Sequence, residues 1–127
     1  MTFLLDTHTL LWAILDDKKL SANAKKCIVE TKNTCYFSIV SLWEITIKHS
    51  LGSLDLKMTL NECFNIITDS GFNELPISKN HLIELDSLPY HHKDPFDRIL
   101  IAQAIHQRLS IITKDTLISN YNVQTVW

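Results

Sequence analysis

Four acidic side chains stand in sequence contexts where carboxylates can do chemistry. Asp6 ends the apolar run "TFLLD", and Asp115 follows the apolar run "SIIT" by two residues. Glu44 lies within "SLWEI" and Asp97 within "DPFDR". Carboxylates gathered at one place repel each other, and a hard divalent cation relieves that repulsion. Mg²⁺ or Mn²⁺ bound there activates water and stabilises charge on a phosphodiester.

The surrounding sequence predicts the elements that must bring these acids together. Short apolar runs alternate with segments of helical periodicity, a pattern typical of the α/β class. We expect one domain over residues 1–127, with a parallel β-sheet flanked by α-helices on both faces. The expected strands span residues 2–6, 35–39, 72–78, 110–113 and 123–127. Pro76 favours an edge position for the third of them.

In this frame the acids are predicted to converge. The carboxyl ends of parallel strands line the ligand crevice of an open sheet, so Asp6 and Asp115 should share one rim. Glu44 belongs to a helix that begins directly after the strand at 35–39. Asp97 falls in the first turn of the helix that begins at Pro95. We therefore predict a metal site built from all four carboxylates.

Each acid also has a structural explanation that the sequence leaves open. Asp6 and Asp115 stand where helix N-caps are common. Glu44 and Lys48 have the i, i+4 spacing of a routine surface ion pair. Asp94 precedes a proline at the first helical position and is fully explained as an N-cap. We keep Asp94 as a candidate additional acid.

Composition excludes several other function classes. The chain of 127 residues has a formal net charge of −2, which excludes a strongly basic coat for nucleic acid. Two glycines are too few for the Walker loop or the GxGxxG fingerprint. Three widely spaced cysteines favour a reduced compartment, and no apolar run has the length of a membrane span. We expect a cytoplasmic protein without membrane contact, with Trp12 and Trp43 in its core.

Four segments, in order, resemble the PIN-domain family. They are "LLDTHTLLW", "SIVSLWEITIKHSLGSLDL", "LPYHHKDPFDRILIAQA" and "IITKD". Their wording is similar to the VapC-like branch of type II toxins, in the subgroup that carries "HxDPFDR". The likeness covers nearly the whole chain, and the combination of the four segments is specific.

This resemblance implies a Mg²⁺-dependent endoribonuclease, the toxin half of a toxin–antitoxin pair. The family's catalytic and metal-binding quartet carries over to Asp6, Glu44, Asp97 and Asp115. The resemblance also implies an RNA substrate, a cognate antitoxin inserted into the active-site groove, and a homodimer. Substrate contacts are expected from four side chains near the acids: Thr113, Lys48, Arg98 and His92.

Two alternatives from other functional classes remain. A receiver-like signalling domain also gathers aspartates around Mg²⁺, and Thr113-Lys114 invites that comparison. A receiver needs an acidic pair after its first strand, however, whereas Asp6 stands alone there. The other alternative is a catalytically silent PIN scaffold that binds a partner protein. Metal-dependent cleavage of RNA distinguishes the nuclease from both.

Overall fold

A five-stranded parallel sheet organises the protein. The computed structural model describes all residues, Met1–Trp127. The strand order is β3-β2-β1-β4-β5, and every neighbouring pair is parallel. The strands are β1 (Thr2–Leu5), β2 (Thr34–Ser38), β3 (Asn73–Leu75), β4 (Ser110–Ile112) and β5 (Thr125–Val126). The predicted α/β class with a parallel sheet is confirmed.

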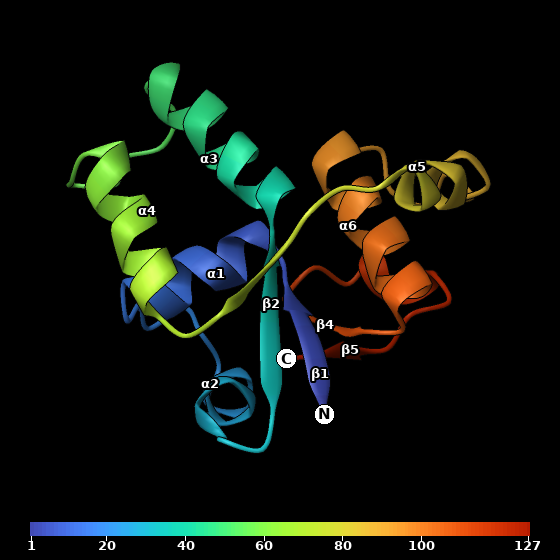
Figure 1. The fold of residues 1–127 in the computed structure, drawn as a ribbon, viewed down its shortest axis with the longest axis horizontal. Helices are drawn as coiled ribbons and strands as arrows, with labels where there is room; N and C mark the ends of the chain where they lie inside the picture. Colours follow the sequence, from blue (N-terminus) through green and yellow to red (C-terminus); the bar gives the residue numbers. More distant parts are fainter.

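Helices cover both faces of this sheet, as predicted. They are α1 (Thr7–Ile14), α2 (Ala22–Val29), α3 (Ile39–Ser50), α4 (Leu60–Asp69), α5 (Lys79–Asp86) and α6 (Pro95–Gln107), with a short 3₁₀ helix at Ile118–Asn120. Figure 1 shows α1, α2 and α4 on one side of the strands and α5 and α6 on the other. Helix α3 continues upward from β2, beyond the end of the sheet (Figure 1). No helix is both long and apolar enough to span a membrane.

Alternation along β1 creates the two halves of the core. Leu4 packs into a cluster with Leu100 and Ile101 of α6. Phe3 and Leu5 point to the opposite face and pack into a cluster that includes helices α1, α2 and α4. Both faces of the central strand are therefore sealed by apolar side chains. Its carboxyl end is the place where polar side chains begin.

Side-chain caps set where the helices begin. Asp6, Ser21, Ser38, Thr59, Ser78 and Asp94 each accept a backbone N–H from the helix that follows. Helix α6 ends at Arg108, which takes a positive φ of 57°. These short local signals give abrupt helix starts immediately after β1 and β2. The acids near those starts are held close to the sheet edge as a result.

Two expectations about the elements can be compared with the structure. Strand β3 lies at the edge of the sheet, as Pro76 predicted. It is shorter than the expected strand at 72–78 and ends at Leu75, because Pro76 has no N–H to continue the ladder. The assignment of Trp43 to the core is wrong, because 59% of this residue is exposed. Trp43 lies on α3, and its ring packs against that of Phe96 with the ring centres 5.2 Å apart. Trp12 is half-buried.

Candidate metal centre

The four predicted acids all lie at the carboxyl-terminal edge of the sheet. Asp6 directly follows β1, and Asp115 lies in the loop after β4. Glu44 is in the second turn of α3, and Asp97 is in the first turn of α6. Asp6 and Glu44 are buried, while Asp97 and Asp115 are partly exposed. The acids form two groups with different hydrogen-bond partners.

Asp6 is a helix cap and also part of the polar edge. Its Oδ1 atom accepts the Thr9 N–H at 2.9 Å. Its Oδ2 atom accepts the hydroxyl of Thr113 at 2.5 Å. The Thr113 oxygen in turn accepts the backbone N–H of Asp115 at 3.0 Å. A single hydroxyl therefore fixes the Asp6 carboxylate relative to the loop that carries Asp115.

Glu44 is held by a hydroxyl and an ammonium group. The hydroxyl of Thr7 donates to its Oε1 atom at 2.7 Å and lies 3.0 Å from the hydroxyl oxygen of Ser41. The ammonium group of Lys48 donates to the Oε2 atom. That hydrogen bond raises the pKa of Lys48, and the negative charges of Glu44, Asp94 and Asp97 add to the effect. Lys48 thus brings a positive charge to the acidic edge.

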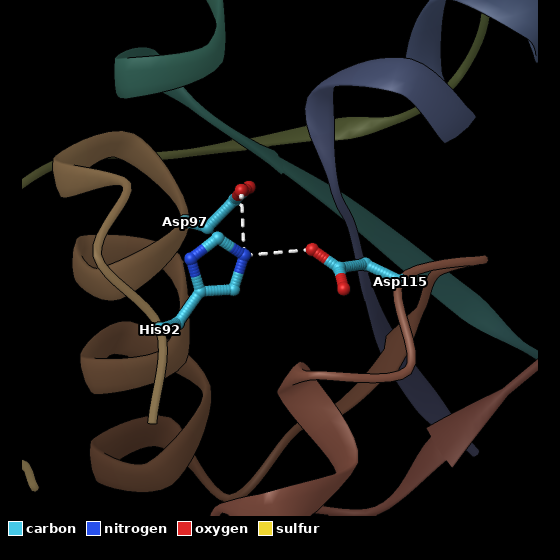
Figure 2. A group of neighbouring side chains, drawn as sticks. All are labelled: His92, Asp97 and Asp115. Atoms are coloured by element: carbon cyan, nitrogen blue, oxygen red, sulfur yellow. Dashed lines mark hydrogen bonds and ion pairs between the residues drawn. The ribbon is translucent and has the colours of Figure 1, made fainter. Parts of the chain in front are cut away.

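Asp97 and Asp115 meet at the imidazole of His92. The Nε2 atom of His92 lies 2.7 Å from Oδ2 of Asp115 and 3.2 Å from Oδ2 of Asp97. Figure 2 shows the ring between the two carboxylates, which come from α6 and from the loop after β4. One donor atom from each of the three residues lies within 4.8 Å of the others. This cluster has the spacing of a metal-binding group.

The environment of Asp97 favours a cation. The pKa of its carboxyl is raised from 3.8 to about 7, mainly by burial and next by the negative charge of Asp94. Asp6 and Glu44 act in the same direction, and only His92 opposes them. A carboxylate in this situation gains stability from a nearby positive charge. An oxygen-rich donor set of this kind fits a hard divalent ion such as Mg²⁺ or Mn²⁺.

Asp94 has the capping geometry that its position beside Pro95 suggests. Its Oδ1 atom accepts the N–H groups of Phe96 at 2.8 Å and Asp97 at 3.2 Å. Asp94 is also the strongest charged neighbour that raises the pKa of Asp97. The carboxylate therefore caps the N-terminus of α6 and adds negative charge beside Asp97. Its assignment as an additional ligand stays a prediction.

Of the four side chains predicted to contact substrate, Arg98 departs most from that expectation, because it is buried. Its guanidinium is buried and donates to the carbonyl oxygens of Pro89 at 2.9 Å and His92 at 3.3 Å. The guanidinium also lies 3.9 Å from the centre of the Tyr90 ring. Through these contacts Arg98 fixes the loop that precedes α6. Contact between Arg98 and a substrate phosphate stays a prediction, and the observed bonds favour a structural role.

Several polar residues of the edge were not among the predicted site residues. Thr7, Thr9 and Ser41 support the acids, and Tyr121 supports the loop before α6. Thr9 donates to the carbonyl oxygen of Ile112 at 2.9 Å and so ties α1 to β4. The two threonines stand one and three residues after Asp6, in "DTHT". Polar residues directly after a strand-end acid are the signal that could have identified them.

The chain belongs to the PIN-domain family, whose pattern it matches over residues 3–123. This match includes Asp6 and Asp115, which follow β1 and β4, and the two helices that carry Glu44 and Asp97. The predicted family is confirmed, while the "HxDPFDR" subgroup stays a prediction. No curated protein is similar enough in sequence to match the chain.

Solved structures with the same fold include toxins of bacterial toxin–antitoxin systems. A chain of the Rickettsia felis VapBC2 structure, bound to a DNA fragment from its promoter, superposes with a TM-score of 0.74 at 15% identity, covering 99% of this chain and 98% of that one. A Klebsiella pneumoniae toxin–antitoxin complex gives 0.65 at 21% identity, with coverages of 98% and 95%. Mycobacterium tuberculosis VapC20, a toxin that cleaves the sarcin–ricin loop, gives 0.64 at 14% identity, covering 95% of each chain.

Proposed function

We propose that this protein is a Mg²⁺- or Mn²⁺-dependent endoribonuclease and the toxin of a toxin–antitoxin pair. The observation that carries the proposal is the meeting of carboxylates around Asp97, whose pKa is raised to about 7 by burial and by its acidic neighbours. Membership of the PIN-domain family supports a nuclease. The fold shared with VapC20, described as a toxin that cleaves the sarcin–ricin loop, supports RNA as the substrate.

The residues that would hold the metal are Asp6, Glu44, Asp97 and Asp115. When bound, the divalent cation supplies positive charge that assists attack of water on phosphorus and supports the leaving oxygen. Asp97 and Asp115 are the most exposed of the four, and both lie beside His92. Asp6 and Glu44 are buried and held by hydroxyl groups, so they would form the inner, less mobile side of the metal site.

Other side chains of the edge would contact the RNA backbone. Lys48 has a side chain 40% exposed, with its ammonium group on Glu44. In this position it would offer a positive charge to a phosphate while remaining tied to the acidic edge. Thr113 would keep the Asp6 carboxylate oriented through its hydroxyl. The net charge of −2 makes this local attraction necessary.

A cognate antitoxin and a second copy of the chain are the proposed protein partners. The relatives of known structure include a toxin–antitoxin complex, which supports an antitoxin as partner.

Exposed Trp43 and Leu82 border an apolar hollow of about 260 Å³ between α3, α5 and α6, which supports a homodimer. Sedimentation of the wild type and of Trp43→Glu tests the homodimer: a dimer for the wild type and a monomer for the variant are expected. The proposed compartment is the cytoplasm.

Of the two alternatives, the receiver-like domain disagrees with the topology. The receiver-type sheet has the order 2-1-3-4-5, whereas the order here is β3-β2-β1-β4-β5. A silent PIN scaffold keeps the same topology and differs only in lacking cleavage. An activity measurement distinguishes the silent scaffold from the proposed nuclease.

The decisive experiment measures cleavage of a broad RNA pool by the purified protein with Mg²⁺ or Mn²⁺, in parallel with EDTA. Asp97→Asn is the matched control, because the amide keeps the size of the side chain and loses the charge. Cleavage that needs the metal and disappears in the variant supports the proposal. Equal cleavage by both proteins indicates a contaminating nuclease. No cleavage of the pool or of defined transfer and ribosomal RNAs favours the silent scaffold.

A further inference from the structure

The imidazole of His92 is the least explained group at the acidic edge. It lies in the loop between α5 and α6 and is only 8% exposed. Its Nε2 atom is within hydrogen-bond distance of both Asp97 and Asp115. Two roles fit these distances. Nε2 either ligates a metal through its lone pair or carries a hydrogen that it donates in a hydrogen bond to Asp115, with Asp97 beside it.

The other ring nitrogen decides between these roles. The backbone N–H of Asp94 donates to Nδ1 of His92 at 3.1 Å. An Nδ1 atom that accepts a hydrogen bond carries no proton, so in the neutral ring the proton is on Nε2. Metal ligation through Nε2 would move that proton to Nδ1, where it would face the Asp94 N–H. The local geometry therefore favours Nε2 as a donor.

The loop holds His92 too firmly for an easy change of ring orientation. The His92 N–H donates to the Tyr121 hydroxyl at 2.8 Å, and its carbonyl accepts from Arg98 at 3.3 Å. The Tyr121 hydroxyl donates to the carbonyl of Pro89 at 2.8 Å. Both backbone polar groups of His92 are therefore bound by side chains from outside the loop. Turning the ring over would break the hydrogen bond that the Asp94 N–H donates to Nδ1.

The hydrogen-bond partners of Asp115 and Asp97 indicate what a donor at Nε2 would do. Asp115 accepts the Leu117 N–H on Oδ1 at 2.9 Å, so with His92 on Oδ2 both of its oxygens are oriented. Oδ2 of Asp97 lies 3.2 Å from the same Nε2 atom (Figure 2). A donor that hydrogen-bonds Asp115 and lies beside Asp97 sets the relative position of the two acids while leaving lone pairs for a cation.

We propose that His92 is a positioning residue: its Nε2–H holds Asp97 and Asp115 together as oxygen ligands and itself stays outside the metal's coordination sphere. The inference rests on the proposed metal-dependent function and deepens it. An all-oxygen site of this kind suits Mg²⁺ and Mn²⁺ better than Zn²⁺.

The first test concerns the ring itself and needs no metal. Nitrogen NMR of the metal-free wild type assigns the tautomer of His92. A protonated Nε2 and an unprotonated Nδ1 are expected. A proton on Nδ1 would overturn the inference. This measurement does not depend on whether the protein cleaves RNA, so it separates this inference from the proposed function.

The second test uses two substitutions, one that keeps a donor at the position of Nε2 and one that keeps an acceptor at the position of Nδ1. In His92→Gln the side-chain amide reaches the Nε2 position and can still donate. In His92→Asn the shorter side chain can still accept from Asp94 but cannot reach the acids. Calorimetric titration with Mn²⁺ should give near-wild-type affinity for the Gln variant and a loss of about tenfold or more for the Asn variant. Equal affinities would contradict the positioning role.

The third test looks directly at the metal. Electron spin-echo modulation from the Mn²⁺-loaded wild type reports any nitrogen bonded to the ion. We expect no directly bonded imidazole nitrogen, and its presence would overturn the inference in favour of ligation. If the wild type binds no Mn²⁺ at all, the metal-dependent function fails and the positioning role fails with it. If Mn²⁺ binds and the His92→Asn variant matches the wild type, only the positioning role fails.

Discussion

The two pairs of acids at the sheet edge differ in how their charges are satisfied. Asp6 and Glu44 are buried, yet between them they accept two hydroxyls, a backbone N–H and an ammonium group. Asp115 is hydrogen-bonded to the imidazole of His92, Asp97 lies 3.2 Å from the same nitrogen, and the pKa of Asp97 is raised to about 7. The carboxylates of the first pair are held by donors from the surrounding fold. In the second pair, Asp97 has a strongly raised pKa, and such a shift is more common at binding sites than elsewhere.

Removing the charge of Asp97 should give the largest effect. Asp97→Asn should lower metal-dependent RNA cleavage by at least about a hundredfold, because a ligand is lost. The same change should stabilise the metal-free protein at neutral pH by on the order of 2 kcal/mol, because a buried, repelled carboxylate is removed. Cleavage assays and urea unfolding in EDTA measure the two effects.

Glu44→Gln is the matched control from the other pair. It leaves an acceptor for Thr7 and removes the ionic partner of Lys48. We expect it to lose activity as well, but to destabilise the metal-free protein by about 1 kcal/mol. Opposite signs of the two stability changes support the distinction between the pairs. The same sign for both would remove it.

The pH dependence of metal binding should follow Asp97. Because its pKa is about 7 instead of 3.8, the folded protein keeps a proton that the unfolded chain loses between these values. The stability of the metal-free protein should therefore fall as pH rises through this window. A metal must displace that proton, so Mn²⁺ affinity should rise by up to about tenfold per pH unit and level off above about pH 7. Titrations at a series of pH values check this, and an affinity independent of pH below 7 would contradict it.

Thr113→Val tests the link between the two pairs. The variant loses the donor to Asp6 and the acceptor of the Asp115 N–H. We expect a loss of stability of about 1 to 3 kcal/mol, since a buried carboxylate loses a partner, and a lower cleavage rate. Thr113→Ser keeps the hydroxyl and should stay close to the wild type in both. If Val and Ser behave alike, the hydroxyl has no such role.

Lys48→Met should give the smallest effect on stability. The ammonium group is partly exposed, so its pair with Glu44 is worth no more than about 1 kcal/mol. RNA affinity should weaken several-fold and lose part of its dependence on salt, because one cation near the phosphate is removed. Binding assays over a range of salt concentrations measure this. An unchanged salt dependence would exclude Lys48 from contact with the RNA backbone.

The sequence was sufficient for the parts of the site that depend on strand ends. Asp6 and Asp115 follow apolar runs, and the parallel sheet brings such positions to one edge whatever the loops do. The surroundings of His92 and Arg98 were not predictable in this way. Their loop is held by Tyr121, which lies 23 residues after Arg98 and hydrogen-bonds across the fold. Trp43 was misplaced because helical periodicity does not reveal that α3 extends beyond the sheet.

Thermal unfolding of the wild type and of Asp97→Asn, each in EDTA and in excess Mn²⁺, tests the central claim most directly. Mn²⁺ at about a hundred times its Kd should stabilise the wild type by about 2 to 3 kcal/mol. Asp97→Asn should show almost no shift, although that variant starts from a higher melting temperature in EDTA. Equal shifts for both proteins, or none for the wild type, would contradict a metal site centred on Asp97.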